Sequence, residues 1–189
     1  WKYQNFLLSK LPIKSTVSTI KKMKTEDVDF FELQNQKIGL AEIIPEFVSC
    51  EKITSSKIGT LTHLVLQKID FNSVKTEKDI KIFLEYLVSK NFINEEEALK
   101  INTKRIFNFL NSNFALKIKN SKKIYKEKPF CIKIDASKIF SECKNKEKIF
   151  VQGIIDLYYI NENGNIVLVD YKTDFVENEN DLIKKYGVQ

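Results

Sequence analysis

Two strand-like runs near the end of the chain, 149–160 and 165–173, each carry an aspartate, and a short polar turn joins them. Asp156 lies in the first run and Asp170 in the second, with Lys172 two residues further on. Aspartate is depleted in strands, and burying its charge costs free energy unless the carboxylate is paired or binds a metal. The pattern therefore predicts a β-hairpin whose acidic side chains have a function.

The length of the turn decides where these side chains point. A three-residue loop at 162–164 (Glu-Asn-Gly), closed by Gly164 in the left-handed conformation, places Asp156 opposite Asp170. Such cross-strand partners share a face, and Lys172 points to that same face. A two-residue loop at 163–164 would shift the register by one residue and send the aspartates to opposite faces.

Two aspartates and a lysine on one face are suited to cleaving phosphodiester bonds. Mg²⁺ prefers oxygen ligands, which Asp156, Asp170 and the backbone carbonyl of Tyr171 can supply. Lys172 can orient or help to deprotonate the attacking water and stabilise developing charge. The alternative is a charged, solvent-facing hairpin in which Lys172 pairs with Asp170 or Asp156.

Helical periodicity dominates the middle of the chain. Residues 58–71 form a predicted helix with an apolar stripe, and His63, the only histidine, lies away from that stripe beside the small residues Gly59 and Thr60. By itself such a histidine is more often a surface or helix-packing residue than a ligand. Further helices are predicted over 17–24, 76–90, 94–100, 102–119 and 178–186.

The other segments give weaker signals. Residues 122–134 read as a strand or hairpin in which Pro129 indicates an edge or a kink, and 136–140 are ambiguous. Residues 1–12 predict a short helix or connector, and 25–56 a long irregular connection. Both ends of the chain are interpreted as those of an excised fragment.

Composition limits the class of protein. The chain has 189 residues, of which 43% are hydrophobic, so it can build a core, and no apolar run is long enough to span a bilayer. Its net charge of +6 is compatible with a phosphate backbone as partner but is weak evidence for one. The three cysteines, Cys50, Cys131 and Cys143, are widely spaced, which predicts reduced thiols and a cytoplasmic location rather than an iron–sulfur cluster.

Several motifs occur in an order that matches a known family. The chain carries G-T-L-T-H at 59–63, G-I-I-D at 153–156 and D-Y-K-T-D at 170–174. This set resembles the nuclease signature of the RecB-type branch of the PD-(D/E)XK superfamily, including its upstream G-x-x-x-H helix. Residues 11–18 and 45–47 resemble the segment before the nuclease in the AddA (RexA) family of helicase–nuclease subunits. Gln189 resembles the first residue of the family's Q-x-x-x-Y motif, whose tyrosine lies beyond this chain.

The resemblance implies a fold and a set of site residues. The fold is an α/β, restriction-endonuclease-like mixed central sheet flanked by helices, with a helical insertion at 72–120. A connector at 1–57 would precede the nuclease core at 58–189, whose C-terminus looks truncated. The resemblance implies catalytic roles for Asp156, Asp170 and Lys172. It implies further that His63 and the Tyr171 carbonyl join the two aspartates around Mg²⁺, with Mn²⁺ also tolerated.

Two weaker candidates concern the substrate. Glu127 lies on a strand before the hairpin, where the family often carries an acidic residue; the alternative is a surface glutamate that pairs with Lys126 or Lys128. Gln189 is the second substrate-binding candidate. No organic cofactor is implied.

The implied function is that of a metal-dependent DNA exonuclease in double-strand-break end processing and recombinational repair. Helicase domains upstream in the intact chain would deliver single-stranded DNA, and an AddB (RexB)-like protein would be the partner. The sequence has no G-x-x-x-x-G-K-[ST] loop, so we expect no ATP hydrolysis by this chain. Two alternatives are a catalytically silent DNA-binding or scaffold domain of the same complex, and a free-standing restriction or resolvase enzyme of the same fold.

Overall fold

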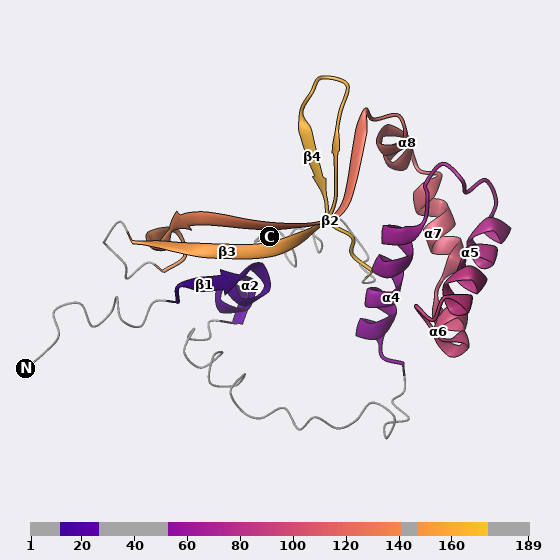
Figure 1. Cartoon of the computed structure of the whole chain (residues 1–189), viewed down its shortest axis with the longest axis horizontal. Helices are drawn as coiled ribbons and strands as arrows, with labels where there is room; N and C mark the ends of the chain where they lie inside the picture. Colours follow the sequence, from indigo (N-terminus) through magenta and orange to yellow (C-terminus); the bar gives the residue numbers. More distant parts are fainter. Residues whose placement is uncertain (1–11, 27–52, 141–146, 174–189) are drawn as a thin grey trace, which may run out of the picture. The chain divides into compact units, whose positions relative to one another are not determined.

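The computed structural model describes residues 12–26, 53–140 and 147–173 (Figure 1). Its elements, in chain order, are β1 Lys14–Thr16, α2 Val17–Glu26, α4 Ser55–Lys68, α5 Glu77–Ser89, α6 Glu95–Lys100, α7 Thr103–Leu110, α8 Asn113–Lys119, β2 Lys123–Asp135, a 3-10 turn at Ala136–Lys138, β3 Lys148–Ile160 and β4 Ile166–Val169. The predictions for 1–11, for 27–52 and for the helix at 178–186 lie outside these ranges, as do Gln189, Cys50 and Cys143.

The four described strands form one mixed sheet, which confirms the predicted mixed α/β class. The strand order is β1-β3-β2, and β4 also pairs with β3. β1 runs parallel to β3, whereas β4 runs antiparallel to it. β2 is a single strand at the end of this order, and so Pro129 lies on an edge strand, as expected.

The hairpin between β3 and β4 has the register that the three-residue loop predicts. Leu157 pairs with Val169 and Ile160 with Ile166, and the N–H of Asn161 donates to the carbonyl of Asn165 at 2.9 Å. Gly164 closes the turn with a φ of 81°, the left-handed region that favours glycine. One step beyond the Leu157 pair, the same register brings Asp156 to the level of Asp170.

The chain divides into two compact units, and each has its own core. In the first (12–26, 129–140 and 147–154 of the described residues), β1 and α2 supply Val17 and Ile20, which pack against the buried Ile149 and Val151. In the second (53–128 and 155–173), helices α4 to α8 enclose a larger core with the last part of β3 and with β4. Its most buried members include Val65, Ile80, Leu87, Leu110, Ile118 and Leu157.

Most predicted helices are confirmed, with small changes at their ends. The helix predicted over 58–71 begins at Ser55, because the side chain of Thr54 accepts from the N–H of Lys57 at 3.2 Å, and it ends at Lys68. α2, α5 and α6 match the predictions at 17–24, 76–90 and 94–100. Among the described helices, none has the length and apolar character needed to cross a membrane.

The single helix predicted over 102–119 is wrong. The structure has two helices, α7 and α8, separated at Asn111 and Ser112. The Ser112 hydroxyl accepts from the N–H of Ala115 at 3.1 Å and so begins the second helix. Asparagine and serine compete with the backbone for hydrogen bonds, which favours ends over interiors of helices. The break lets Leu110 and Ile118 both reach the core.

Glu97 joins α6 to α4 in the second unit. Its carboxylate accepts from the N–H of Asn94 at 2.9 Å in a capping box and pairs with the Lys57 ammonium at 2.8 Å. The Lys57 contact and the Asn94 N–H lower the pKa of Glu97. A carboxyl whose pKa falls on folding stabilises the protein above its unfolded pKa, and that stabilisation is lost as the pH drops through the folded value.

Glu97→Ala is therefore expected to lower the free energy of unfolding by about 1–2 kcal/mol at neutral pH. The difference from wild type should shrink as the pH falls below about 4. Urea unfolding at several pH values measures both effects, with Glu96→Ala as the control because Glu96 is exposed in the same helical turn. An equal loss in the two variants would contradict the assignment of Glu97.

Candidate metal centre

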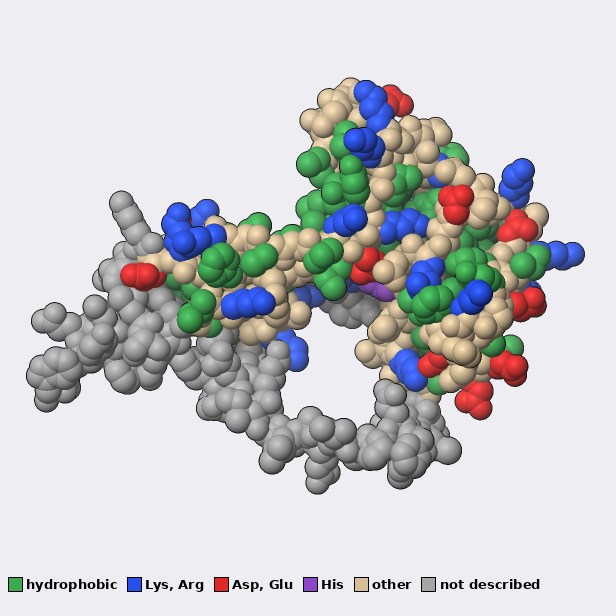
Figure 2. Space-filling view, viewed as in Figure 1, with side chains coloured by type: hydrophobic (Ala, Val, Ile, Leu, Met, Phe, Trp, Pro, Cys, Tyr) green, Lys and Arg blue, Asp and Glu red, His purple; other side chains and the backbone are tan. Residues whose placement is uncertain are grey.

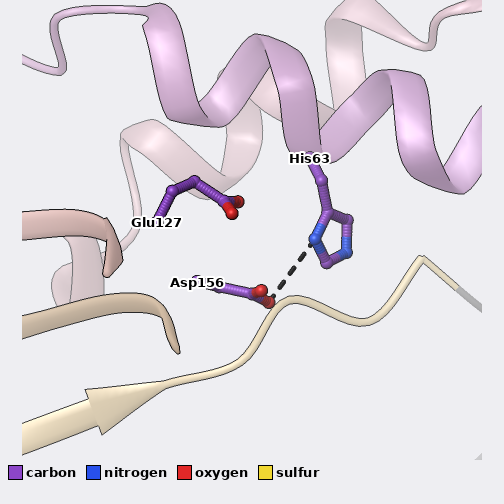
Figure 3. A group of neighbouring side chains, drawn as sticks. All are labelled: His63, Glu127 and Asp156. Carbon is purple, nitrogen blue, oxygen red and sulfur yellow. Dashed lines mark ion pairs between the residues drawn. The ribbon is translucent and has the colours of Figure 1, made fainter. Parts of the chain in front are cut away.

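Three side chains from three separate elements converge in the second unit. His63 comes from α4, Glu127 from β2 and Asp156 from β3, and Figure 3 shows all three pointing toward one another. One potential ligand atom of each lies within 4.8 Å of the others. In the space-filling view the chain's one histidine is visible beside an acidic side chain (Figure 2). All three residues are partly buried, which suits a site that solvent and a ligand can still reach.

His63 lies between two oxygen atoms. Its Nδ1 is 3.4 Å from Asp156 Oδ2, and its Nε2 is 2.9 Å from the carbonyl oxygen of Tyr171. The same Asp156 oxygen accepts a hydrogen bond from the Tyr171 N–H at 2.9 Å. The three residues thus fix one another, and the Tyr171 carbonyl that the resemblance implies as a ligand faces the imidazole.

Strands β2 and β3 are neighbours in the sheet, which explains why Glu127 reaches this place. The ring of Tyr125 stacks on that of Tyr158, with centroids 4.6 Å apart. Two residues further along β2 and two back along β3, Glu127 comes opposite Asp156 on the same face of the strands. The Lys126 side chain instead donates to carbonyls of α4, which disfavours the alternative in which Glu127 pairs with Lys126.

The charges of the cluster are coupled. The carboxylate of Asp156 raises the pKa of His63 above its ordinary value, and burial opposes this only in part. Burial alone would raise the pKa of Asp156, but the contacts from His63 and the Tyr171 N–H outweigh it and lower that pKa. Burial and the Asp156 charge raise the pKa of Glu127. Two carboxyl groups so close together favour a cation between or beside them.

The donor set fits a divalent cation. A neutral imidazole has one N–H, so only the imidazolium form of His63 could donate both to Asp156 and to the Tyr171 carbonyl. A divalent cation bound by these atoms would supply the same positive charge. Carboxylate and carbonyl oxygens suit Mg²⁺, and imidazole is more readily tolerated by Mn²⁺.

Asp170 and Lys172 lie at the edge of the cluster. Their carboxylate and ammonium form an ion pair, so they share a face as the sequence predicts. The side chain of Asp170 is 51% exposed, and its carboxylate is not one of the group within 4.8 Å. The Asp170 charge nevertheless helps to raise the pKa of His63, which places it close by. Its role as a metal ligand remains a prediction.

Gly59 explains why α4 can lie so close to the end of the hairpin. A Cβ atom at this position would come within 2.9 Å of Thr173 Oγ1, immediately after the Asp170–Lys172 segment. The guanidinium of Arg105 also donates to the Thr173 carbonyl at 2.8 Å. The close approach expected at the small residues of this helix is thus made by Thr173, and it keeps His63 near Tyr171.

Sequence patterns find most of this site but undervalue one member. His63, Asp156 and the Tyr171 carbonyl come together as expected, whereas the sequence assigns Glu127 only to substrate contact. The available signal for Glu127 is an acidic residue within a strand, close to Pro129. Cys131 is a free, exposed thiol, in agreement with the expected reduced state.

Comparison with known proteins identifies close relatives. No family model matches the chain. It is 34% identical over 194 residues to the AddA-type ATP-dependent helicase/nuclease subunit of Alkaliphilus oremlandii, an alignment that covers 100% of the chain and 16% of that protein. The proteins of the same name in Clostridium kluyveri and Clostridium botulinum (strain Hall) are 35% and 34% identical to it, again along the whole chain. The chain spans about a sixth of the length of these relatives.

Proposed function

We propose a function on the premise that the chain belongs to the AddA family of ATP-dependent helicase/nuclease proteins, with which it aligns over its whole length. It is the nuclease segment of such a protein, namely a Mg²⁺-dependent exonuclease that hydrolyses phosphodiester bonds in DNA. The observation that carries this proposal is the convergence of His63, Glu127 and Asp156 beside the Asp170–Lys172 pair. The relatives' printed name, which includes a nuclease, supports it.

The residues of the site divide the work of hydrolysis. His63, Asp156 and the Tyr171 carbonyl hold the cation, with Glu127 and Asp170 as the further carboxylates within reach. When bound, the cation neutralises the scissile phosphate and makes water easier to deprotonate. Lys172 orients the attacking water and stabilises charge that develops on the phosphate. Asp170 keeps the Lys172 ammonium beside the cluster through their ion pair.

The wider assignment follows from the same premise. We assign residues 58–189 to a restriction-endonuclease-like nuclease core with a helical insertion at 72–120, after a connector at 1–57. Helicase domains in the intact chain deliver single-stranded DNA to it from a duplex end. An AddB (RexB)-like protein is the partner, and the role is cytoplasmic repair of double-strand breaks by recombination. Gln189 is a substrate contact within this assignment.

A cleavage assay tests the proposal directly. Linear single-stranded DNA should be degraded from its ends in the presence of Mg²⁺ or Mn²⁺ and left intact with EDTA. Lys172→Ala should slow cleavage by about 10²–10³-fold while DNA binding is retained, because the lysine acts on the reacting groups. DNA binding without cleavage under either metal would favour the silent, scaffold alternative. Gel analysis of the products, with DNA binding measured in parallel, separates these results.

A further inference from the structure

A lysine next to the cluster holds the helix that carries His63. The ammonium of Lys126, on β2, donates to the carbonyl of Leu66 at 2.9 Å and to that of Ile69 at 2.5 Å. Leu66 lies in the last turn of α4, and Ile69 is its C-cap. The same ammonium lies 3.9 Å from the centre of the Phe71 ring. Carbonyls at a helix end lack intrahelical partners and form the negative end of the helix dipole, so a cation stabilises them.

The backbone of the next residue lets β2 contact α4 twice. In a regular strand the side chains of Lys126 and Glu127 would point to opposite faces. Glu127 has a φ of 48°, a left-handed conformation that is uncommon for any residue but glycine. The side chain of Lys126 thereby reaches the C-terminal end of α4, while that of Glu127 reaches His63 near its middle. Strained backbone of this kind tends to be retained where function needs it.

We propose that Lys126 is a positioning residue of the metal centre: it fixes α4 against β2 and so sets the separation between His63 and Glu127. This inference rests on the proposed function of the cluster. His63 precedes Leu66 by less than one helical turn, so a shift of the helix end moves the imidazole directly. Lys126 touches neither the cation nor the reacting atoms, and it acts only through α4.

Loss of the ammonium has two consequences for the site. The carbonyls of Leu66 and Ile69 lose a charged donor, and the helix end is free to move away from β2. Partners of this indirect kind typically change metal affinity or activity by about 10–100-fold when they are removed. The effect should therefore appear in metal affinity, and not only in overall stability.

Lys126→Met in the full 189-residue chain tests the inference, with two readouts. The first is the Kd for Mn²⁺ by calorimetric titration, which should rise about tenfold. The second is the ring signal of His63 by NMR without metal, which is unambiguous because the chain has one histidine. That signal should shift or broaden. Lys126→Arg, which keeps a charged donor, should restore both, and Lys128→Met is the control because Lys128 is exposed on the same strand.

The two readouts separate the possible failures. Unchanged Mn²⁺ affinity together with an unchanged His63 signal in Lys126→Met would overturn the positioning role. A wild-type chain that binds no Mn²⁺ would overturn the proposed function, while the His63 signal would still decide whether Lys126 positions the imidazole. If Lys126→Met is unfolded by circular dichroism, Lys126→Gln takes its place, with the same expected changes.

Discussion

Asp156→Ala is expected to abolish Mn²⁺ binding and to lower the rate of single-stranded DNA cleavage by about a thousandfold. Asp156 is the carboxylate that both His63 and the Tyr171 N–H contact, at 3.4 and 2.9 Å, so its removal takes away a ligand and the residue that fixes two others. A divalent cation contributes several kcal/mol to such a reaction, and each 1.36 kcal/mol corresponds to a factor of ten in rate.

Two controls give this prediction its meaning. Glu162→Ala removes an exposed carboxylate from the turn of the same hairpin and should leave metal affinity and cleavage unchanged. Asp156→Ala should also remain folded by circular dichroism, since Asp156 lies outside the buried core. Cleavage of a folded Asp156→Ala variant at the wild-type rate would remove the basis for the proposed mechanism.

Gly153→Ala is expected to destabilise the chain by about 1–3 kcal/mol, although alanine usually replaces glycine in a strand at little cost. A Cβ atom at Gly153 would lie 2.8 Å and 2.9 Å from two ring atoms of Phe130 and 3.0 Å from Val17 Cγ2. Its backbone does not need a positive φ, so the penalty comes from packing. Urea unfolding of the two proteins measures the loss.

A double-mutant cycle identifies the cause of this loss. Phe130→Leu shortens the side chain that blocks a Cβ atom at Gly153, and so Gly153→Ala should cost less in the Phe130→Leu background than in wild type. The expected coupling is about 1 kcal/mol. Equal costs in the two backgrounds would show that the Phe130 contact does not exclude a side chain at this position.

Local chemistry accounts for the parts of the fold that the sequence predicted well. The hairpin register follows from a turn in which only Gly164 needs the left-handed conformation, and this requirement is readable from three residues. The helix ends follow from capping residues such as Thr54 and Asn94. Because the register is fixed by the turn, Asp156 could be placed at the level of Asp170 without knowledge of any other contact.

Contacts between distant segments account for what was missed. Glu127 joins the cluster because its φ is positive and because β2 lies against α4, and neither feature has a signature in the sequence. The break between α7 and α8 had a signal, the Asn-Ser-Asn run at 111–113, but the apolar periodicity on both sides concealed it. The gap between the Asp156 cluster and the Asp170–Lys172 pair likewise depends on packing.

The central claim is that one divalent cation binds where His63, Asp156 and the Tyr171 carbonyl meet. A crystal of the chain grown with Mn²⁺, with diffraction recorded near the manganese absorption edge, tests it most directly. We predict a single strong anomalous peak in contact with the Asp156 carboxylate and the His63 imidazole. A crystal at saturating Mn²⁺ with no such peak, in which the His63 ring still contacts the Tyr171 carbonyl, would contradict the claim.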